Sequence, residues 1–210
     1  MAAPWTQDRG GLYTRVSIAE EQIEGLRGWR ADAYAEYGVT ARLTLTGKLE
    51  TLSYSDAADF NSDAWRATLR YHLLSLRQFR FSAELGALQG AAIGGRNGCE
   101  ALGGEARLGA AWSGGSEDRQ MFAFAETAGR FHGACNRQRY EFGIGQQITQ
   151  EIWSITQFWR ERGNTNANSD KIQSELLWRA GATDYSIGYR NENGGFFREE
   201  AVFAAIATRF

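Results

Sequence analysis

The chain has 210 residues, of which 43 % are hydrophobic and 23 % are charged, a balance that excludes a disordered or collagen-like chain. Its net charge of −2 provides no broad basic surface, so we exclude nucleic acid as a partner. No run approaches the roughly 18 apolar residues that a membrane helix needs, which excludes a helical membrane protein but not a membrane barrel.

Residues 1–10 precede the first regular pattern and are expected to form an N-terminal segment before a single domain over residues 11–210. Ala2 and Ala3 followed by Pro4 resemble the start of a mature chain whose signal peptide was replaced by an initiator methionine. A native start would look the same, so the pattern does not separate the two origins.

Apolar and polar residues alternate along most of the chain, a pattern that predicts strands rather than helices. In chain order, twelve strands are predicted over residues 11–19, 28–36, 41–54, 63–73, 78–87, 104–112, 119–131, 139–145, 151–162, 172–179, 185–192 and 197–210. The alternation is clearest between residues 63 and 73, where every second residue from Trp65 to Leu73 is apolar. A helix over residues 19–37 is the competing interpretation, but Gly25 and Gly28 would interrupt it, so a loop is predicted over residues 20–27.

The connections between the predicted strands alternate between short and long. The short set covers residues 37–40, 74–77, 113–118, 147–150 and 181–184, and the longer set covers residues 20–27, 55–62, 92–103, 132–137, 163–170 and 193–195. Short turns at one end and longer loops at the other are typical of outer-membrane barrels. The sequence therefore predicts an all-β fold, an up-and-down antiparallel transmembrane β-barrel of twelve strands.

The end of the chain carries a more specific pattern. The residues two, four, six and eight positions before Phe210 are Thr208, Ile206, Ala204 and Val202. This segment resembles the C-terminal β-signal of Gram-negative outer-membrane proteins, in which these positions face lipid, although a larger residue is commoner at the position of Thr208. Residues 36–43, which include Tyr37 and Leu43, are similar to the periplasmic turns of outer-membrane barrels described as transporters.

The resemblance implies an outer-membrane location in a Gram-negative bacterium, with both termini in the periplasm. It also implies two partners: outer-membrane lipid, and the barrel-assembly machinery, which the C-terminal segment would contact. In a barrel surrounded by lipid, apolar side chains face outward and polar ones face the lumen. Aromatic residues near the strand ends on the lipid face would form membrane girdles, and these are Trp29, Trp65, Tyr71, Trp112, Phe131, Tyr140, Trp178 and Phe210. In a soluble β-protein they would be core residues.

The polar faces of the predicted strands place a dense and nearly balanced set of charges in the lumen. The basic members are Arg15, Arg30, Arg42, Lys48, Arg66, Arg70, Arg80, Arg107, Arg139, Arg179 and Arg190. The acidic members are Asp32, Glu36, Glu50, Glu84, Glu105, Glu126, Glu141, Glu175 and Glu192. Two interpretations stay open: ion pairs between strands fill the interior, or part of the set lines a water-filled pore and determines its selectivity. Twelve strands lie between the roughly eight of a filled barrel and the 16–18 of a porin, so barrel width does not decide.

The two histidines do not form an evident catalytic group. His72 is expected on the lumen face near Arg70, and His132 at the start of an outer loop. A lipid-modifying hydrolase would need a serine and a histidine within hydrogen-bond reach, and no His-x-Ser spacing is present. Glu199 and Glu200 are expected to be solvated charges at the outer rim. No metal site and no cofactor are predicted.

Cys99 and Cys135 fall in long connections on the same predicted side of the barrel. A disulfide between them, typical of an oxidising compartment, would join two outer loops. Two buried free thiols are the alternative interpretation.

These observations favour a channel for a small or extended polar solute, with the lumen arginines as contacts for anionic groups. A closed barrel plugged by ion pairs, with a structural role or a periplasmic partner, is the second hypothesis. A lipid-modifying enzyme that depends on His132 is the third, and a soluble β-barrel is the fourth.

Overall fold

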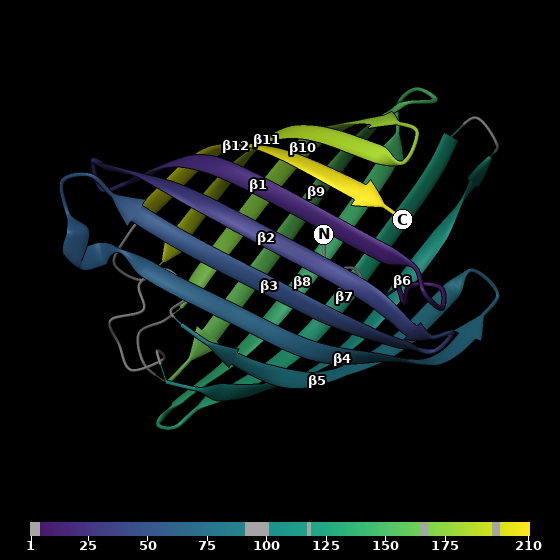
Figure 1. The fold of residues 1–210 in the computed structure, drawn as a ribbon, viewed down its shortest axis with the longest axis horizontal. Helices are drawn as coiled ribbons and strands as arrows, with labels where there is room; N and C mark the ends of the chain where they lie inside the picture. Colours follow the sequence, from purple (N-terminus) through teal and green to yellow (C-terminus); the bar gives the residue numbers. More distant parts are fainter. Residues whose placement is uncertain (1–4, 91–100, 117–118, 165–167, 195–197) are drawn as a thin grey trace.

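The computed structural model describes residues 5–90, 101–116, 119–164, 168–194 and 198–210. Within them the chain forms a closed antiparallel barrel in which each strand pairs with its sequence neighbours and β12 pairs with β1 (Figure 1). The strands are β1 Leu12–Ile23, β2 Leu26–Thr40, β3 Leu43–Tyr54, β4 Ser62–Leu76, β5 Phe79–Gln89, β6 Gly103–Ser116, β7 Arg119–His132, β8 Cys135–Gln147, β9 Ile152–Gly163, β10 Ser169–Ala180, β11 Thr183–Gly194 and β12 Arg198–Arg209. The short 3-10 helix η1, Ala58–Phe60, lies between β3 and β4.

The distribution of side chains across the barrel wall is the reverse of that in a soluble protein. Successive residues of a strand point to opposite faces of the sheet, so the alternating sequence separates apolar from polar residues. The outward face is apolar, with Leu85 at 65 % and Ile187 at 64 % exposure. The inward face carries charges, of which Arg70, Glu21 and Glu199 are 0 % exposed. Charged residues are among the least often buried in soluble proteins.

The predicted all-β, twelve-stranded up-and-down barrel is confirmed. Every predicted strand is present, and most begin earlier or end later than predicted. No helix in the described residues is long and apolar enough to cross a membrane.

Two of the predicted long connections are wrong. The two-residue turn Glu24–Gly25 replaces the loop over residues 20–27, and Gly133–Ala134 replaces the loop over residues 132–137. Glu24 and Gly25 have φ of 47° and 88°, the positive values that a tight turn between twisted strands requires. Gly25 does interrupt a helix, but it does so as part of a tight hairpin turn. The alternation of apolar and polar residues therefore continues through the residues predicted to form loops.

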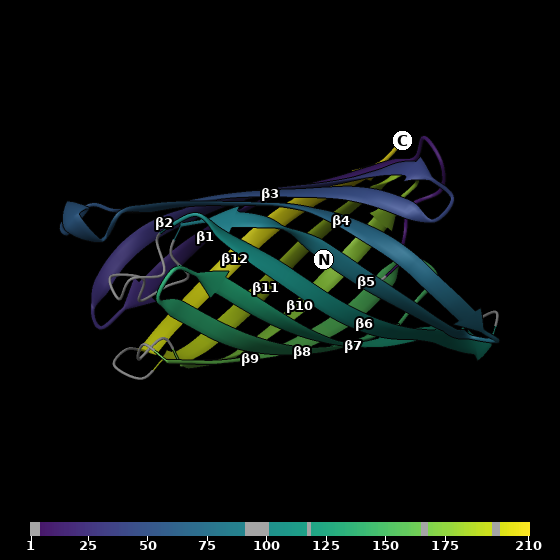
Figure 2. The same cartoon turned by 90° about the horizontal axis from the view of Figure 1, so that it is seen from below.

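The two ends of the barrel differ in their connections. Turns at residues 41–42, 77–78, 148–151 and 181–182 lie at one end, which we call the short-turn end. The seam between β1 and β12 also ends there, at the end of the barrel where the C-terminus lies (Figure 2). Leu12 N–H donates to the carbonyl of Phe210 at 3.1 Å, and Phe210 N–H donates to the carbonyl of Leu12 at 2.8 Å. Before β1, Trp5 and Gln7 contact side chains of the inner face near this end, whereas Asp8 and Arg9 are exposed.

Candidate functional site

Most of the predicted lumen charges face inward. They are Arg15, Arg30, Asp32, Glu36, Lys48, Glu50, Arg66, Arg70, Glu84, Glu105, Arg107, Glu126, Arg139, Glu141, Glu175, Arg190 and Glu192. Arg179 lies at the short-turn rim, where its Nε is 3.1 Å from Asp184 Oδ1. The interior of the barrel is therefore dominated by charge.

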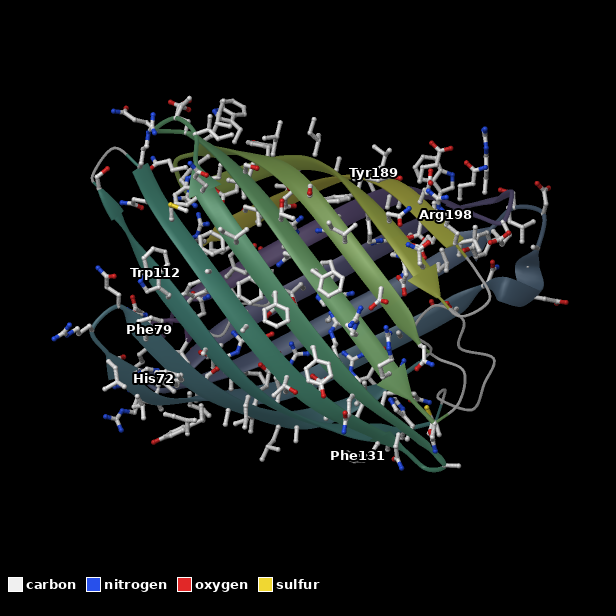
Figure 3. The ribbon with its side chains drawn as sticks, turned by 180° about the vertical axis from the view of Figure 1, so that it is seen from behind. His72, Phe79, Trp112, Phe131, Tyr189 and Arg198 are labelled. Carbon is white, nitrogen blue, oxygen red and sulfur yellow. The ribbon has the colours of Figure 1, made fainter. Side chains whose placement is uncertain are left out.

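Two predicted lumen residues, Arg42 and Arg80, do not face the lumen. Arg42 belongs to the turn at residues 41–42, and its side chain is exposed. The β4–β5 hairpin shifts register between His72 and Leu74, and residues 73–80 are all exposed, so Arg80 lies on the projecting hairpin. His72 lies at this end too, where its ring is 3.0 Å from Ser75 Oγ rather than beside Arg70 (Figure 3).

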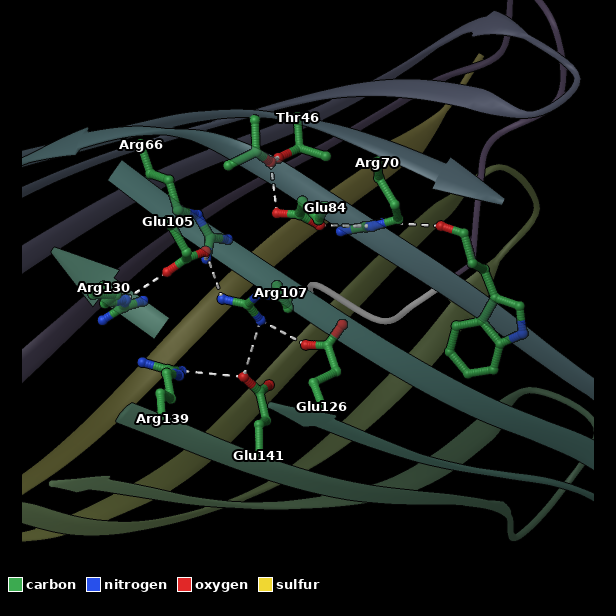
Figure 4. A network of polar contacts seen from close by, with 12 residues as sticks. Thr46, Arg66, Arg70, Glu84, Glu105, Arg107, Glu126, Arg130, Arg139 and Glu141 are labelled. Atoms are coloured by element: carbon green, nitrogen blue, oxygen red, sulfur yellow. Dashed lines mark hydrogen bonds and ion pairs between the residues drawn. The ribbon is translucent and has the colours of Figure 1, made fainter. Parts of the chain in front are cut away.

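One cluster of ion pairs covers the inner face of β4 and β6 to β9, and we call it the arginine wall (Figure 4). Its members are Arg66, Glu105, Arg107, Glu126, Arg130, Arg137, Arg139, Glu141 and Glu161. Glu105 accepts hydrogen bonds from Arg66 at 3.2 Å, Arg107 at 3.0 Å and Arg130 at 2.5 Å. Glu161 accepts from Arg130 at 2.7 Å, Arg137 at 3.2 Å and Arg139 at 3.0 Å. Each of these two buried carboxylates holds three guanidinium groups, which keeps the arginines in fixed positions.

A second cluster covers β11, β12 and β1 to β3, and we call it the opposite wall. Its members are Glu21, Arg30, Asp32, Lys48, Glu50, Arg190 and Glu199. Arg30 is paired with Glu21 and Glu50, and Arg190 with Glu21 and with Glu199 at 2.8 Å. The arginine wall has one more basic than acidic member, whereas the opposite wall has one more acidic than basic member.

A third group lies towards the short-turn end, around Arg70. Its Nη1 donates to Glu36 Oε1 and its Nε to Glu84 Oε2, both at 2.8 Å. Glu84 also accepts a 2.5 Å hydrogen bond from Thr68, whose hydroxyl is 2.6 Å from that of Thr46. Arg70 therefore has two carboxylate partners in a site from which water is excluded.

A cavity of about 270 Å³ lies in the lumen between the two walls. Of the described residues that line it, ten are basic and five are acidic. The basic residues are Arg15, Arg30, Lys48, Arg66, Arg107, Arg130, Arg137, Arg139, Lys171 and Arg190, and the acidic residues are Asp32, Glu50, Glu141, Glu161 and Glu192. Several carboxylates that hold these arginines, such as Glu105 and Glu21, do not line the cavity, so its surface is more basic than the whole lumen.

The arginine wall also presents hydrogen-bond donors without acceptors. Within the described part of the chain, the buried Nε atoms of Arg66, Arg107, Arg137 and Arg139 and the Nε1 atom of Trp159 have no hydrogen-bond partner. All five residues line the cavity. Buried donors are normally paired, and exceptions require an explanation such as a missing ligand or ion.

Several members of these clusters lie outside the predicted set of lumen charges. Glu21 and Arg137 fell in predicted loops that are tight hairpins. Glu199 was predicted to be solvated, but it faces inward and pairs with Arg190. Every second residue of a strand lies on the same face, and this parity places Glu199 with the buried Ala201 and Phe203. The same parity argument on β7 and β9 would have found the other two missed members of the arginine wall, Arg130 and Glu161.

Most of the aromatic residues predicted for the membrane girdles are exposed on the outside. Trp29, Tyr71, Phe131, Tyr140, Trp178 and Phe210 are exposed, and Trp65 and Trp112 are half-buried. Three indole groups hydrogen-bond near strand ends: Trp65 to Gln89 at 3.2 Å, Trp112 to Gln78 at 2.9 Å and Trp178 to Glu151 at 3.1 Å. Aromatic residues lie towards both ends of the barrel: Trp112 and Phe79 towards one end, and Phe131 and Tyr189 towards the other (Figure 3). Such amphipathic residues suit the two borders of a membrane.

The predicted loop position of His132 is wrong, because β7 extends through it. Its ring is fully buried, with Nδ1 2.9 Å from the carbonyl oxygen of Ala101 and Nε2 3.5 Å from Arg137. Cys135 is buried at the start of β8, but Cys99 lies outside the described residues, so the disulfide stays a prediction. Within the described ranges, no group of three or more His, Cys, Asp or Glu side chains is placed to hold a metal ion.

No family model and no curated protein matches the sequence. The structure is similar to the KdgM porin, with a TM-score of 0.64 and 9 % identity over 93 % of this chain and 99 % of that one. The NanC porin matches with a TM-score of 0.61 and 9 % identity over 92 % of this chain and 98 % of that one. The COG4313 outer membrane channel from Pseudomonas putida F1 matches with a TM-score of 0.61 and 11 % identity over 100 % of this chain and 99 % of that one.

The chain has the fold of the outer-membrane β-barrel proteins. The resemblance that the sequence showed to this class is confirmed at the level of the fold. In β12, Val202, Ala204 and Ile206 are exposed on the outside, as the C-terminal pattern of outer-membrane barrels predicts. The C-terminal strand of the barrel therefore has the orientation on which its predicted contacts with lipid depend.

Proposed function

We propose that the chain is an outer-membrane channel for small or extended polar solutes that carry anionic groups. The reversed distribution of side chains supports the membrane location, since an apolar outer face is stable in lipid and a closed barrel leaves no backbone group unpaired there. The proposal places both termini, and with them the short-turn end, in the periplasm.

The preference for anionic groups rests on the hydrogen-bond donors of the arginine wall that have no acceptor. Arg107 and Arg137 line the cavity, are 4 % and 3 % exposed, and have buried Nε atoms without an acceptor. Guanidinium groups fixed by neighbouring carboxylates are already oriented, so a solute carboxylate or phosphate would bind without rearranging them. The remaining acidic residues on the wall limit how tightly an anion is held, which a conducting site requires.

The similar structures are consistent with this solute class. Two are porins and one is an outer membrane channel. The KdgM porin has also been solved in complex with disordered oligogalacturonate, with a TM-score of 0.60 and 8 % identity to this chain. Oligogalacturonate is an extended polar chain with one carboxylate on each sugar, the kind of solute that a lumen of this charge would admit.

The proposed function can be tested by measuring ion currents through the protein in a planar bilayer. Refolded protein would be inserted into a planar bilayer, with insertion confirmed by a heat-dependent gel shift, and the current measured in a KCl gradient. We expect discrete steps and a reversal potential that favours chloride over potassium. A reversal potential that favours potassium would contradict the anionic preference, and inserted protein without current would contradict the channel.

A closed barrel with a structural or partner-binding role is the second candidate. The observation that favours it is the filling of the short-turn end, where Trp5, Phe122 and Trp153 pack inside the barrel. This candidate predicts that protein with the same gel shift carries no current under any condition.

A further inference from the structure

Trp5 lies inside the barrel, held by two kinds of contact. Its carbonyl oxygen accepts a 2.8 Å hydrogen bond from Nη1 of Arg70, a residue that is fully buried in the lumen. Its indole ring meets Phe122 edge-on, with 5.4 Å between the ring centres, and lies 6.4 Å from Phe124. The segment that precedes β1 thus reaches from the β4 wall to β7.

Gln7 provides the second attachment of this segment. Its backbone N–H donates to Thr44 Oγ1 at 2.9 Å, and its side-chain amide donates to Glu36 Oε2 at 2.5 Å. Both acceptors are buried on the inner face of β2 and β3. Residues 5–7 are therefore fixed to specific lumen side chains at two separate points.

The strand β2 has a glycine, Gly38, at the point where the segment passes close to it. A Cβ at Gly38 would overlap the carbonyl oxygen of Asp8, so only glycine permits this approach. Gly11 N–H then donates to the same carbonyl at 2.9 Å, and Gly10 N–H donates to the carbonyl of Gly38 at 2.7 Å. Gly10 has a φ of 79°, which reverses the chain towards β1.

Trp5 joins an apolar layer on the inner face of β6, β7, β9 and β10 near the short-turn end. Phe122 on β7 lies 6.0 Å from Trp153 on β9, and Trp153 belongs to a buried cluster with Ile155 and Leu177. On β9 and β10 the residues of this layer lie nearer the short-turn end than the cavity-lining Gln157 and Gln173. An apolar constriction excludes water and ions, which is how hydrophobic gates close.

Release of the segment would leave no buried charge unpaired. Arg70 keeps its hydrogen bonds to Glu36 and Glu84 when the carbonyl of Trp5 leaves, and Glu36 keeps Arg70 when Gln7 leaves. The segment has no partner along a strand ladder before Gly10, so it can withdraw without breaking the barrel.

We propose that residues 5–9 are a gate that closes the short-turn end of the lumen by placing Trp5 against Phe122 and Phe124. This inference rests on the proposed channel function and adds its regulation. The structure holds the closed state, and conduction requires Trp5 to leave the apolar layer.

Two variants open the gate by independent routes. Trp5→Ala removes the ring from the layer, and Gly38→Ala pushes the Asp8 carbonyl away from β2 without changing the segment. Gly47→Ala is the matched control, because a Cβ at Gly47 on the neighbouring strand β3 would contact nothing within 4 Å. Trp5→Phe should retain most of the closure.

Single-channel recording on the four variants and the wild-type protein tests the gate. We expect the mean current to rise several-fold in Trp5→Ala and in Gly38→Ala, and to stay at the wild-type value in Gly47→Ala. Equal currents in all five proteins would overturn the gate and leave the channel standing. Silence in all five, with the gel shift of inserted protein intact, would overturn the gate together with the channel.

Discussion

Glu105 and Arg130 stand directly opposite each other on β6 and β7, and Oε2 of Glu105 accepts a 2.5 Å hydrogen bond from Nε of Arg130. The other carboxylate oxygen accepts from Arg66 and Arg107. One acidic side chain thus joins three strands of the arginine wall, and the position of each guanidinium group depends on it.

Glu105→Gln is expected to be strongly destabilising. It leaves three buried guanidinium groups without their shared carboxylate, and removing one partner of a buried ion pair costs about 3–5 kcal/mol. We expect the free energy of unfolding, measured by urea titration of protein in lipid vesicles, to fall by about 3 kcal/mol or more. Glu200→Gln is the control, because Glu200 pairs with Arg198 on the exterior at 2.9 Å, and we expect a loss of about 0–1 kcal/mol. Equal losses in the two variants would contradict the role of Glu105.

Arg139→Gln is expected to reduce anion selectivity. Arg139 lines the cavity and is the most accessible member of the arginine wall, with 22 % of its side chain exposed, so its loss changes charge with little disturbance of packing. A unit charge about 4 Å from an ion in water contributes about 1 kcal/mol, which corresponds to about a fivefold fall in the chloride-to-potassium permeability ratio.

Arg160→Gln provides the control for this measurement. Arg160 lies on β9 but faces outward, where it pairs with Asp170 at 2.7 Å. Removal of this charge should leave the reversal potential in a KCl gradient unchanged. If Arg160→Gln shifted the potential as much as Arg139→Gln, the ions would not be selected at the arginine wall.

Ile187→Arg tests whether the outer face contacts lipid. Ile187 lies near the middle of β11 and is 64 % exposed, so in a membrane an arginine there would meet the hydrocarbon interior. We expect folding into vesicles to be weakened by about 2–4 kcal/mol, against about 0–1 kcal/mol for Asn193→Arg at the end of the same strand. A soluble barrel would show no such difference between the two positions, because water would solvate both arginines.

The predicted disulfide can be tested directly. We expect a non-reduced digest of native protein to contain one peptide pair linked through Cys99 and Cys135, and Cys135→Ala to lower the free energy of unfolding by about 3 kcal/mol through loss of the cross-link. Mass spectrometry that finds both cysteines as free thiols would exclude the bond.

The strands could be predicted because a two-residue alternation leaves a direct record in the sequence. From Trp65 to Leu73 and from Val202 to Phe210, the period determines which side chains face outward. The two wrongly predicted connections lie at glycines, where the alternation of apolar and polar residues cannot be followed in the sequence alone. Gly25 and Gly133 indicate an interruption, but whether a loop or a tight hairpin follows depends on φ values that the sequence does not state.

The candidate site was predictable only in part. Parity indicates that Arg107 and Glu126 face the lumen, but it does not indicate that Glu105 and Glu161 would each hold three arginines, which depends on register between strands. Parity places Arg80 on the same face as Ser82 and Glu84, but it does not show that Arg80 lies on the exposed, projecting part of the hairpin. The position of Trp5 depends on hydrogen bonds to its backbone, which leave no periodic pattern.

The seam between Leu12 and Phe210 has a consequence for the order in which the barrel is assembled. β1 pairs with β12, the last barrel strand in chain order, so one edge of β1 lacks its partner until β12 has been synthesised. An unpaired strand edge readily joins other chains, and pairing between distant residues is slow. The nascent barrel therefore needs protection of this edge, and shortening or disrupting β12 should expose β1 to aggregation even when the other eleven strands have paired.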